Sequence, residues 1–362
     1  MKKILSVVGT RPQFIKAGPL SFELRKYFQE ILVHTGQHYD YGMSEIFFTE
    51  LSIPEANYNL CIGSASHGKM TGEMLSKIEN VILKENPDIV LVYGDTNSTL
   101  AGALAAVKLH IPIAHVEAGL RSYNKSMPEE INRILSDQVS TWLFVPSKVA
   151  KHNLKQENIK KGVFEVGDIM FDVLLANSKK ASEISNVLKA NELTPHNYFV
   201  VTVHRAENTD DKEKLSRILD IFASVKENMI LPIHPRTKNK INGFGLVIPK
   251  NVSTIEPLGY LDMLELMQNA KAIFTDSGGI QKEAYYLNIP CITLRKESEW
   301  IETVEVGWNF IVGTDKIKFE SAFQQLHKVK DRKHPLLYGD GTTAKKIVDV
   351  LREHFKIEAP QT

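Results

Sequence analysis

Short, continuously apolar segments alternate with helical patterns along almost the whole of this 362-residue chain. Continuous hydrophobicity is typical of parallel strands that are covered by helices on both faces, whereas half-exposed strands alternate apolar and polar residues. The alternation therefore predicts an α/β fold with doubly wound parallel sheets. The expected strands are 4–8, 30–35, 89–93, 113–116, 142–145 and 163–166 in the first half, and 198–203, 229–233, 252–255, 272–275 and 291–294 in the second.

The length predicts about two domains at roughly 150 residues each. Residues 172–196 are rich in Ser, Lys and Asn and contain a long helical pattern, so we place the boundary just before them. The predicted domains are 1–171 and 172–341. The last helix is expected over 342–355, where Thr342 follows a glycine-rich turn and suits an N-cap.

Composition excludes several classes of protein. The formal net charge is +1, from 44 basic and 43 acidic residues, which argues against bulk binding of nucleic acid or anionic lipid. No apolar run approaches the roughly 20 residues of a membrane span, and the N-terminal apolar run is too short for a signal peptide. Cys61 and Cys291 are too few for a disulfide framework, and we expect both to be buried thiols in a reducing cytosol.

Several common signatures are missing or incomplete. The segment 63–70 nearly matches a P-loop, but Met70 stands where a Ser or Thr would bind Mg²⁺. No G-x-G-x-x-G occurs, so the usual dinucleotide fingerprint is absent. The 12 histidines form no H-E-x-x-H pair and no Cys/His cluster, so we expect neither a metal site nor a cofactor.

A glycine-rich turn after the expected strand 272–275 is the best candidate for a phosphate site. Ser277, Gly278 and Gly279 would present backbone N–H groups at a helix N-terminus, where the helix dipole favours an anion. Asp276 precedes the turn, and Glu283 lies about two helical turns further on, where it could accept a hydrogen bond from a ribose. Without these acids, a strand-to-helix turn with no ligand would be the better interpretation.

In the first half, charged residues follow three expected strands at the edge where open α/β sheets bind ligands. Arg11 follows the first strand, Asp95 the strand 89–93 and Glu117 the strand 113–116. A helix beginning near Pro128 then adds Glu129, Glu130 and Arg133. Most have a structural alternative: a solvated loop cation for Arg11, a helix N-cap for Asp95, an ion pair with Arg121 for Glu117, and partners of the helix dipole for the two glutamates.

The second half repeats this pattern with histidines. His204 and Arg205 follow the strand 198–203, and His234 and Arg236 follow the strand 229–233. A single histidine at a strand end is usually structural. Two His–Arg clusters at the edge that also carries the Ser-Gly-Gly turn instead predict a cradle for a diphosphate.

Taken in order, these motifs resemble the non-hydrolysing UDP-N-acetylglucosamine 2-epimerases along essentially the whole chain. The resemblance implies a GT-B arrangement of two Rossmann-like domains, with the C-terminal helix (342–362) returning to the first domain. The motifs that carry it are Gly9-Thr10-Arg11-Pro12, Thr35-Gly36-Gln37-His38, Gly94-Asp95-Thr96, the run from His115 to Arg121, the run from Pro128 to Arg133, His204-Arg205, His234-Pro235, the run from Asp276 to Gln281, and Tyr338-Gly339-Asp340-Gly341.

Two departures favour one branch of that family. The branch acting on UDP-N-acetylglucosamine would carry Thr-Glu-Arg-Pro-Glu after the last strand, where this chain has Ser298-Glu299-Trp300-Ile301-Glu302. Gln13 also stands where that branch has Glu. Both features resemble the branch acting on UDP-2,3-diacetamido-2,3-dideoxyglucuronate. The segment Gln37-His38-Tyr39 matches the region where family members hold a second nucleotide-sugar, and we expect such control to be altered or absent here.

The resemblance implies that UDP is eliminated across C1 and C2 of the sugar and then re-added, with a proton returning to the opposite face of C2. We expect a UDP-sugar as the only partner apart from a second copy of the chain in a homodimer. A GT-B glycosyltransferase is the first alternative and a UDP-sugar-binding sensor the second. The implied acid/base residues are Asp95, Glu117, Glu129 and His204, and the implied substrate-binding residues are Arg11, Lys16, Arg133, Arg205, His234, Asp276, Ser277, Gly278, Gly279 and Glu283.

Overall fold

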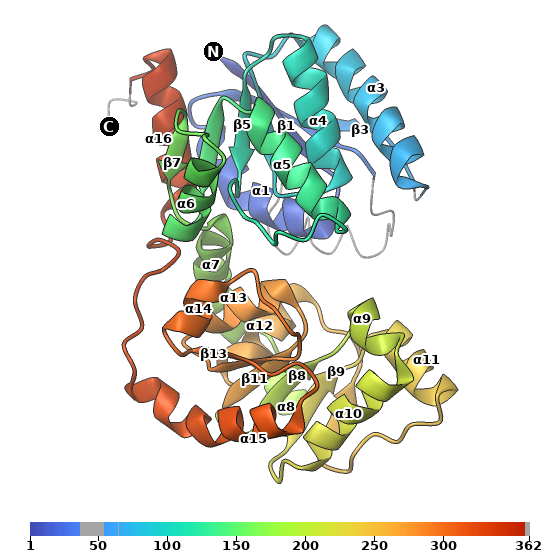
Figure 1. Ribbon diagram of the computed structural model, residues 1–362. Helices are drawn as coiled ribbons and strands as arrows, with labels where there is room; N and C mark the ends of the chain where they lie inside the picture. The colour runs from blue at the N-terminus through green and yellow to red at the C-terminus, as the bar shows by residue number, and fades with distance from the viewer. Residues whose placement is uncertain (37–53, 64, 359–362) are drawn as a thin grey trace. The chain divides into compact units, whose positions relative to one another are not determined.

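The computed structural model describes residues 1–36, 54–63 and 65–358. The chain forms two compact units, Met1–Leu175 together with Leu336–Thr362, and Ala176–Pro335. Helix α7 (Ile169–Ile184) carries the chain from the first unit into the second (Figure 1). Each unit is an α/β structure built around one parallel sheet, so the predicted fold class is confirmed.

The first unit has a seven-stranded sheet in the order β3-β2-β1-β4-β5-β6-β7, and every neighbouring pair is parallel. All six strands expected in the first half are present, and β3 is an additional strand of two residues that is too short to show a pattern. The strands are β1 (Lys3–Val8), β2 (Gln29–His34), β3 (Tyr58–Asn59), β4 (Ile89–Tyr93), β5 (Ile113–Val116), β6 (Trp142–Val145) and β7 (Val163–Glu165).

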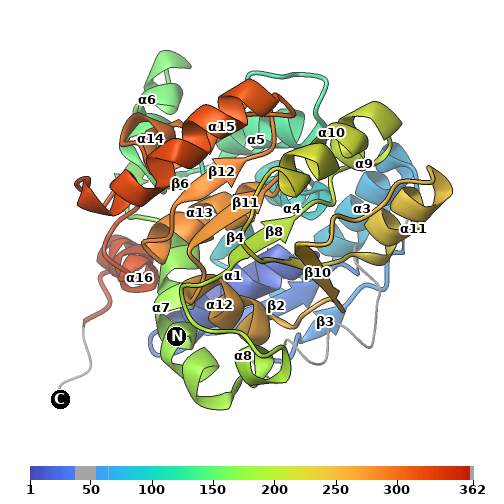
Figure 2. The same ribbon diagram turned by 90° about the horizontal axis from the view of Figure 1, so that it is seen from below.

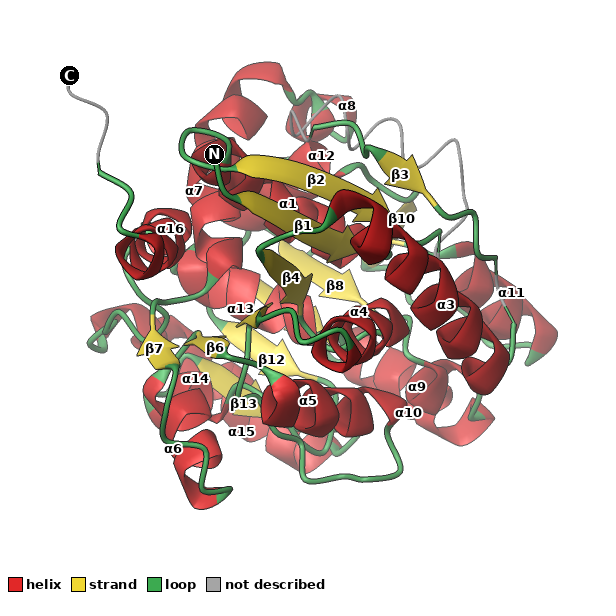
Figure 3. Cartoon of the chain, turned by 90° about the horizontal axis from the view of Figure 1, so that it is seen from above, coloured by secondary structure: helices red, strands yellow, loops and turns green. Residues whose placement is uncertain are grey.

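Helices cover both faces of this sheet. Successive strand residues point to opposite faces, so neighbouring residues pack into different cores. Ile4 packs into the core on the side of α1 and α16, and its neighbour Leu5 into the core on the side of α3 and α4. Figure 3 shows α3, α4 and α5 on one side of the strands and α1 on the other. The helices are α1 (Arg11–Leu24), α3 (His67–Glu85), α4 (Asn97–Lys108), α5 (Pro128–Val139), α6 (Lys148–Gln156) and α16 (Thr343–Phe355).

The C-terminal helix α16 begins where the sequence predicts, but its capping differs. Thr342 occupies the N-cap position without a capping side-chain hydrogen bond. The carboxylate of Asp172, on α7, instead accepts hydrogen bonds from the backbone N–H groups of Thr343 (3.1 Å) and Ala344 (2.8 Å). A residue far away in the sequence therefore satisfies the first turn of this helix.

The second unit has a six-stranded parallel sheet in the order β10-β9-β8-β11-β12-β13. Helices α10, α11 and α15 pack on one face and α8, α12 and α13 on the other, and Figure 2 shows α10 and α15 across the near face. The strands are β8 (Phe199–Thr202), β9 (Met229–Pro232), β10 (Val252–Ile255), β11 (Ala272–Thr275), β12 (Cys291–Thr293) and β13 (Asn309–Ile311), of which β13 was not predicted. The helices are α8 (Val187–Ala190), α9 (Ala206–Thr209), α10 (Lys212–Ala223), α11 (Pro235–Gly243), α12 (Tyr260–Gln268), α13 (Gly278–Tyr286), α14 (Ile301–Glu305), α15 (Lys316–Gln325) and the 3₁₀ helix η1 (Leu326–Asp331).

The two cysteines differ in environment. Cys291 is buried, and burial raises the pKa of its thiol to about 12. Cys61 is exposed, so the expectation that both thiols are buried was wrong for this residue. Its backbone has a positive φ of 52°, which marks a loop position rather than an interior strand. Among the described residues, no helix is long and apolar enough to cross a membrane.

Candidate active site

The candidate site of the first unit lies at the carboxyl ends of β1, β4 and β5, which are neighbours in the sheet. The strand order reverses its direction between β1 and β4, and this switch point is where doubly wound sheets leave an opening for a ligand. Three loops leave this edge, at Gly9, at Gly94 and at Glu117, and the last of them continues to the start of α5. Two of the sequence-predicted carboxylates, Asp95 and Glu117, are therefore on adjacent loops of one sheet edge.

Glu117 forms an ion pair with Lys16, which lies one turn into α1. The two side chains are only 9% and 11% exposed, so Lys16 is not a solvated helix lysine. Glu117 adopts a left-handed φ of 69°, a strained conformation for a residue with a side chain. Such strain at a strand end is typical of functional sites, and it directs the carboxylate toward α1.

The alternative ion pair between Glu117 and Arg121 is not formed. The Arg121 guanidinium instead contacts Asp137 (2.8 Å) and Glu157 (2.7 Å), and it is almost fully buried. Burial would raise the pKa of Asp137, but hydrogen bonds from His115 and Arg121 lower it overall. Arg121 thus belongs to a buried structural network, and Glu117 is left to pair with Lys16.

Asp95 is held by Arg133 rather than acting as a helix cap. Its Oδ2 atom lies 2.6 Å from Nη2 and 2.9 Å from Nε of Arg133, and the N-cap of α4 is Thr96. Burial would lower the pKa of Arg133, but Asp95 and Glu130 raise it overall. The Asp95 side chain remains 29% exposed, so a substrate can reach it while the two-point contact fixes its direction.

The adjacent glutamates of α5 have different environments. Glu130 is buried and accepts hydrogen bonds from Arg133 (2.9 Å) and from the backbone N–H groups of Ser122 and Tyr123 (both 2.9 Å). Glu129 is exposed, and its side chain has no partner among the described residues. Glu130 therefore orders the loop and Arg133, and Glu129 is the one free to meet a substrate.

In the second unit, the switch point lies between β8 and β11, and a buried carboxylate occupies it. Asp276 is 0% exposed and accepts hydrogen bonds from the backbone N–H groups of His204 (3.1 Å) and Arg205 (3.0 Å). The side chain of Asn208 donates to the same carboxylate at 3.1 Å. Asp276 thus shapes the loop that carries His204 and Arg205 and is shielded from solvent itself.

The His204 side chain is 44% exposed, with Nδ1 3.7 Å from Oδ1 of Asp276. Partial burial lowers the pKa of His204 below its usual range, opposed by the charge of Asp276 and assisted by Arg205 and His234. His234 is the N-cap of α11, and its Nδ1 accepts from the backbone N–H of Arg236 at 3.2 Å. Arg236 itself binds Asp210 at 2.5 Å, so the second expected His–Arg cluster contributes only its histidine.

Helix α13 begins at the predicted glycine turn, with Ser277 at the N-cap and Gly278 as the first helical residue. A Cβ atom on Gly278 would lie 3.4 Å from Oε2 of Glu299 and 3.7 Å from Nη2 of Arg205. Glu299 is held by two hydrogen bonds from Arg295, at 2.8 and 3.0 Å. The first turn of α13 therefore combines bare N–H groups with the nearby Arg205, which suits a phosphate, and Arg295 neutralises the neighbouring Glu299 carboxylate.

Trp300, which distinguishes this chain from the pattern of one branch, borders the same turn. It is 6% exposed, and the ammonium of Lys282 lies 4.1 Å from the centre of its ring. Sequence reasoning missed Lys282, Arg295 and Glu299. Arg295 follows β12 at the carboxyl edge of the sheet, which is the signal that could have identified it.

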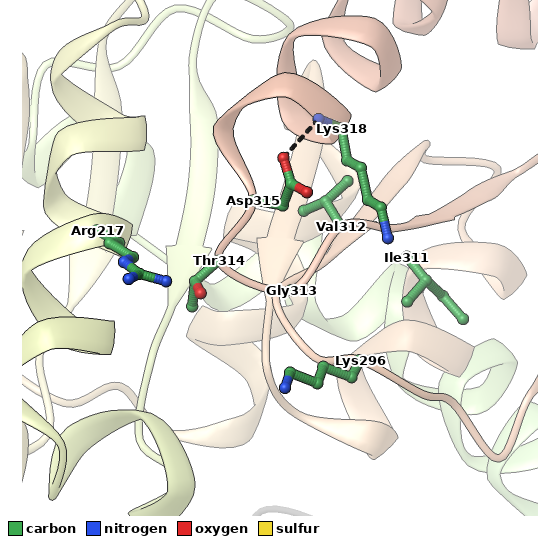
Figure 4. Close-up of a pocket in the computed structure, with 8 residues that line it drawn as sticks. All are labelled: Arg217, Lys296, Ile311, Val312, Gly313, Thr314, Asp315 and Lys318. Carbon is green, nitrogen blue, oxygen red and sulfur yellow. Dashed lines mark hydrogen bonds between the residues drawn. The ribbon is translucent and has the colours of Figure 1, made fainter.

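A hollow of about 390 Å³ lies where β12 and β13 end and is lined by residues that include Arg217, Lys296 and Lys318 (Figure 4). None of the predicted site residues line it. The segment Gln37-His38-Tyr39 lies outside the described residues. Within the described residues, no group of three or more potential metal ligands comes together.

Comparisons with known proteins identify close relatives. The family model of UDP-N-acetylglucosamine 2-epimerases matches residues 21–352. A UDP-N-acetylglucosamine 2-epimerase homolog of Methanococcus maripaludis is 52% identical over 97% of this chain and 99% of its own length. The UDP-2,3-diacetamido-2,3-dideoxy-D-glucuronate 2-epimerase of Pseudomonas aeruginosa is 48% identical over 96% and 99%. The crystal structure of Methanocaldococcus jannaschii UDP-GlcNAc 2-epimerase with UDP-GlcNAc and UDP is 46% identical, with a TM-score of 0.88 over 98% of this chain and 100% of that one.

Proposed function

Because the chain belongs to the UDP-N-acetylglucosamine 2-epimerase family, we propose that it inverts C2 of a UDP-2-acetamido sugar by eliminating and re-adding UDP. It is an isomerase of the non-hydrolysing type that acts on a UDP-sugar. The C2 hydrogen of such a sugar is not next to a carbonyl, so simple proton exchange is slow. Elimination avoids this difficulty, since the departing UDP takes the electron pair of the C1–O bond.

The observation that carries the mechanism is the pair of carboxylate–cation contacts on adjacent loops, Asp95 with Arg133 and Glu117 with Lys16. A carboxylate removes the C2 proton, the C–H electrons form the C1=C2 double bond, and UDP departs. UDP then attacks C1 again while a second acid returns a proton to the opposite face of C2. Positioned acid/base groups of this kind contribute roughly 10²–10⁴-fold to a rate. We assign this work to Asp95, Glu117 and the exposed Glu129.

We assign UDP binding to the second unit. The diphosphate is placed at the first turn of α13, next to Arg205, and Glu283 is assigned to the ribose. His204 has a lowered pKa and is therefore neutral near pH 7, so it can accept or donate a proton at the leaving phosphate. Arg11 and His234 complete the assigned substrate contacts. Asp276 is assigned a supporting role, since its carboxylate is enclosed by the loop that it shapes.

We propose UDP-2,3-diacetamido-2,3-dideoxyglucuronate as the substrate, in a pathway that supplies surface polysaccharide precursors. Trp300 and Gln13 support this choice, and so does the name of the Pseudomonas aeruginosa relative. UDP-N-acetylglucosamine is the other candidate sugar, because relatives of similar identity carry its name. We further propose a cytosolic homodimer. A glycosyltransferase activity has no support in the family to which the chain belongs.

Turnover in D₂O tests the mechanism. If the C2 proton leaves and solvent supplies its replacement, NMR must find deuterium at C2 of the product from a UDP-sugar incubated without an acceptor. Asp95→Asn and Glu117→Gln should each slow this exchange by about 10²–10⁴-fold while calorimetry shows UDP affinity nearly unchanged. Epimer without deuterium at C2 would rule out elimination, and full activity in both variants would refute the residue assignment.

The placement of UDP has its own test. Ser277→Ala and Glu283→Gln should weaken UDP binding in calorimetry, because both residues lie on the helix assigned to the nucleotide. Unchanged affinity in both variants would mean that UDP binds elsewhere.

A further inference from the structure

Three consecutive backbone carbonyl groups in the loop that carries Asp95 each accept a hydrogen bond from a buried side chain. The carbonyl of Tyr93 accepts from Gln13 at 2.7 Å, and that of Gly94 lies 2.7 Å from Nε2 of His115. The carbonyl of Asp95 accepts from Asn132 at 2.9 Å. The three donors come from α1, β5 and α5, so the loop is fixed from three separate elements.

Gln13 is 2% exposed, and its side-chain amide both donates and accepts hydrogen bonds. Its Nε2 group donates to the Tyr93 carbonyl, and its Oε1 atom accepts from the backbone N–H groups of Gly9 (2.8 Å) and Thr10 (3.2 Å). A glutamate here could accept the same two bonds, but an ionised carboxylate would face the Tyr93 carbonyl without a proton to donate. Gln13 thus joins the loop after β1 to the loop after β4.

His115 is 0% exposed and lies between two acceptors. Its Nε2 faces the Gly94 carbonyl, which cannot donate, and its Nδ1 lies 2.7 Å from Oδ1 of Asp137. Asp137 also accepts from Arg121 and from the backbone N–H of Gly119, and its pKa is lowered, so it is a carboxylate. Nε2 must therefore donate to the Gly94 carbonyl, and the ring is held between that carbonyl and the Asp137 carboxylate.

Asn132 is 5% exposed and immediately precedes Arg133, which binds the Asp95 carboxylate. Consecutive residues of α5 thus hold the two ends of the same amino acid, its carbonyl and its side chain. The side chain of Asn132 also donates to Asn97 at 3.3 Å, which secures its direction.

We propose that Gln13, His115 and Asn132 are positioning residues that fix the Asp95 carboxylate for proton transfer. This inference rests on the proposed role of Asp95 as an acid/base group. The three side chains are buried and act through the backbone, so they do not touch the substrate. Their effect comes from geometry, since a reacting group displaced by about 1 Å can lose about 10²-fold in rate.

The test combines single variants with an Asp95→Asn background. Gln13→Met and Asn132→Leu remove the donors with little change in size, and each should lower kcat and C2 exchange by about 10- to 100-fold. KM and UDP affinity should remain nearly unchanged. In the Asp95→Asn background, the same substitutions should cause no further loss, because they act only through Asp95.

Asn251→Ala is the matched control. Asn251 also donates from its amide to backbone carbonyls, of Phe222 and Val225 (both 2.9 Å), but it precedes β10 at the amino edge of the other sheet. It should lower the thermal midpoint without changing kcat. If Gln13→Met prevents folding, Gln13→Glu takes its place. ¹⁵N NMR should find a proton on Nε2 of His115, the nitrogen that faces the Gly94 carbonyl.

The outcomes separate this proposal from the proposed function. If Asp95→Asn itself retains full exchange, the acid/base assignment is wrong. If Asp95→Asn is inactive while the Gln13 and Asn132 variants keep full kcat, the positioning role is wrong. Losses that multiply with that of Asp95→Asn would also overturn it, because they would show an effect that does not pass through Asp95. A His115 ring without a proton on Nε2 would remove that residue from the set.

Discussion

Gly94 follows β4, at a position where a side chain would contact the Glu117–Lys16 ion pair. It adopts a left-handed φ of 60°, and a Cβ atom there would lie 3.3 Å from Oε2 of Glu117 and 3.7 Å from Nζ of Lys16. Gly94→Ala should therefore cost about 1–2 kcal/mol in stability from the backbone alone. By pressing on the Glu117–Lys16 pair, it should also lower kcat by about 10-fold or more.

Urea titration and steady-state kinetics check this prediction, with Gly72→Ala as the control. Gly72 lies inside α3, is exposed, and has open space around the position of a Cβ. Alanine there should stabilise the helix by about 0.5–1 kcal/mol and leave kcat unchanged. An active, stable Gly94→Ala enzyme would show that the loop can move away from Glu117.

His34 gives a prediction of pH dependence. Burial lowers its pKa to about 4, and its Nε2 atom has no hydrogen-bond partner among the described residues. As pH falls below about 6.5, His34 takes up a proton in the unfolded chain, whereas in the folded protein it does so only near pH 4. Stability should therefore fall across this interval, by about 3 kcal/mol in total.

Urea midpoints measured from pH 7 to pH 4 test the effect of His34. His34→Gln removes the titrating group, so its stability should depend less steeply on pH over the same range. Parallel curves for the two proteins would assign the acid sensitivity to other groups.

At this scale, the sequence predicted the identity of the charged residues better than their partners. Asp95 and Glu117 were candidates because polar residues directly follow apolar strands, whereas Lys16 was implied by the resemblance. The pairing of Glu117 with Lys16 rather than Arg121 depends on how α1 crosses the sheet edge, and spacing along the chain contains no such information. The choice between Glu129 and Glu130 likewise depends on which one faces the loop of Ser122 and Tyr123.

At the scale of elements, the first turn of α16 depends on a side chain of another helix. Asp172→Ala removes the acceptor of two buried N–H groups, those of Thr343 and Ala344. The loss should be about 1–2 kcal/mol, as for a helix cap. Thr342→Ala, at the formal N-cap, should change stability by less than about 0.5 kcal/mol, because its side chain makes no capping bond.

Thermal denaturation of both variants measures this difference. A larger effect of Thr342→Ala than of Asp172→Ala would contradict the capping assignment. The sequence predicted the start of α16 correctly because Thr follows a glycine turn. It could not predict the actual cap, since a contact between residues 172 and 343 is set by tertiary packing.

The strands show the same division between local and tertiary information. Long apolar runs were predicted because burial on both faces leaves a continuous pattern. The edge strands β3 and β13, with two and three residues, are too short for any pattern to be recognised. The helix at Gly278 was predicted because its N-terminal glycines follow a strand. Arg295 and Glu299 were not predicted as its neighbours, because they come from a loop whose path the sequence does not specify.

At the scale of the whole molecule, the first unit is completed by the end of the chain. Helix α16 contributes Ile347, Val348 and Leu351 to the core that also contains residues of α1, and all three are at most 1% exposed. Burial of a side chain of this size contributes about 1.5–3 kcal/mol, so the three together supply about 5–9 kcal/mol. This is comparable to the entire stability of a typical domain, about 5–15 kcal/mol.

A chain ending at Pro335 should therefore lose the first unit and keep the second, since residues 176–335 form a unit with its own sheet and cores. Hydrogen exchange should find little protection in β1 and β4 but near-native protection in β8 and β11. Leu351→Ala is the milder form of the experiment and should cost about 2–5 kcal/mol, whereas Leu336→Ala, at a side chain 70% exposed, should cost little. Full protection of β1 in the shortened chain would mean that the first unit folds without its last helix.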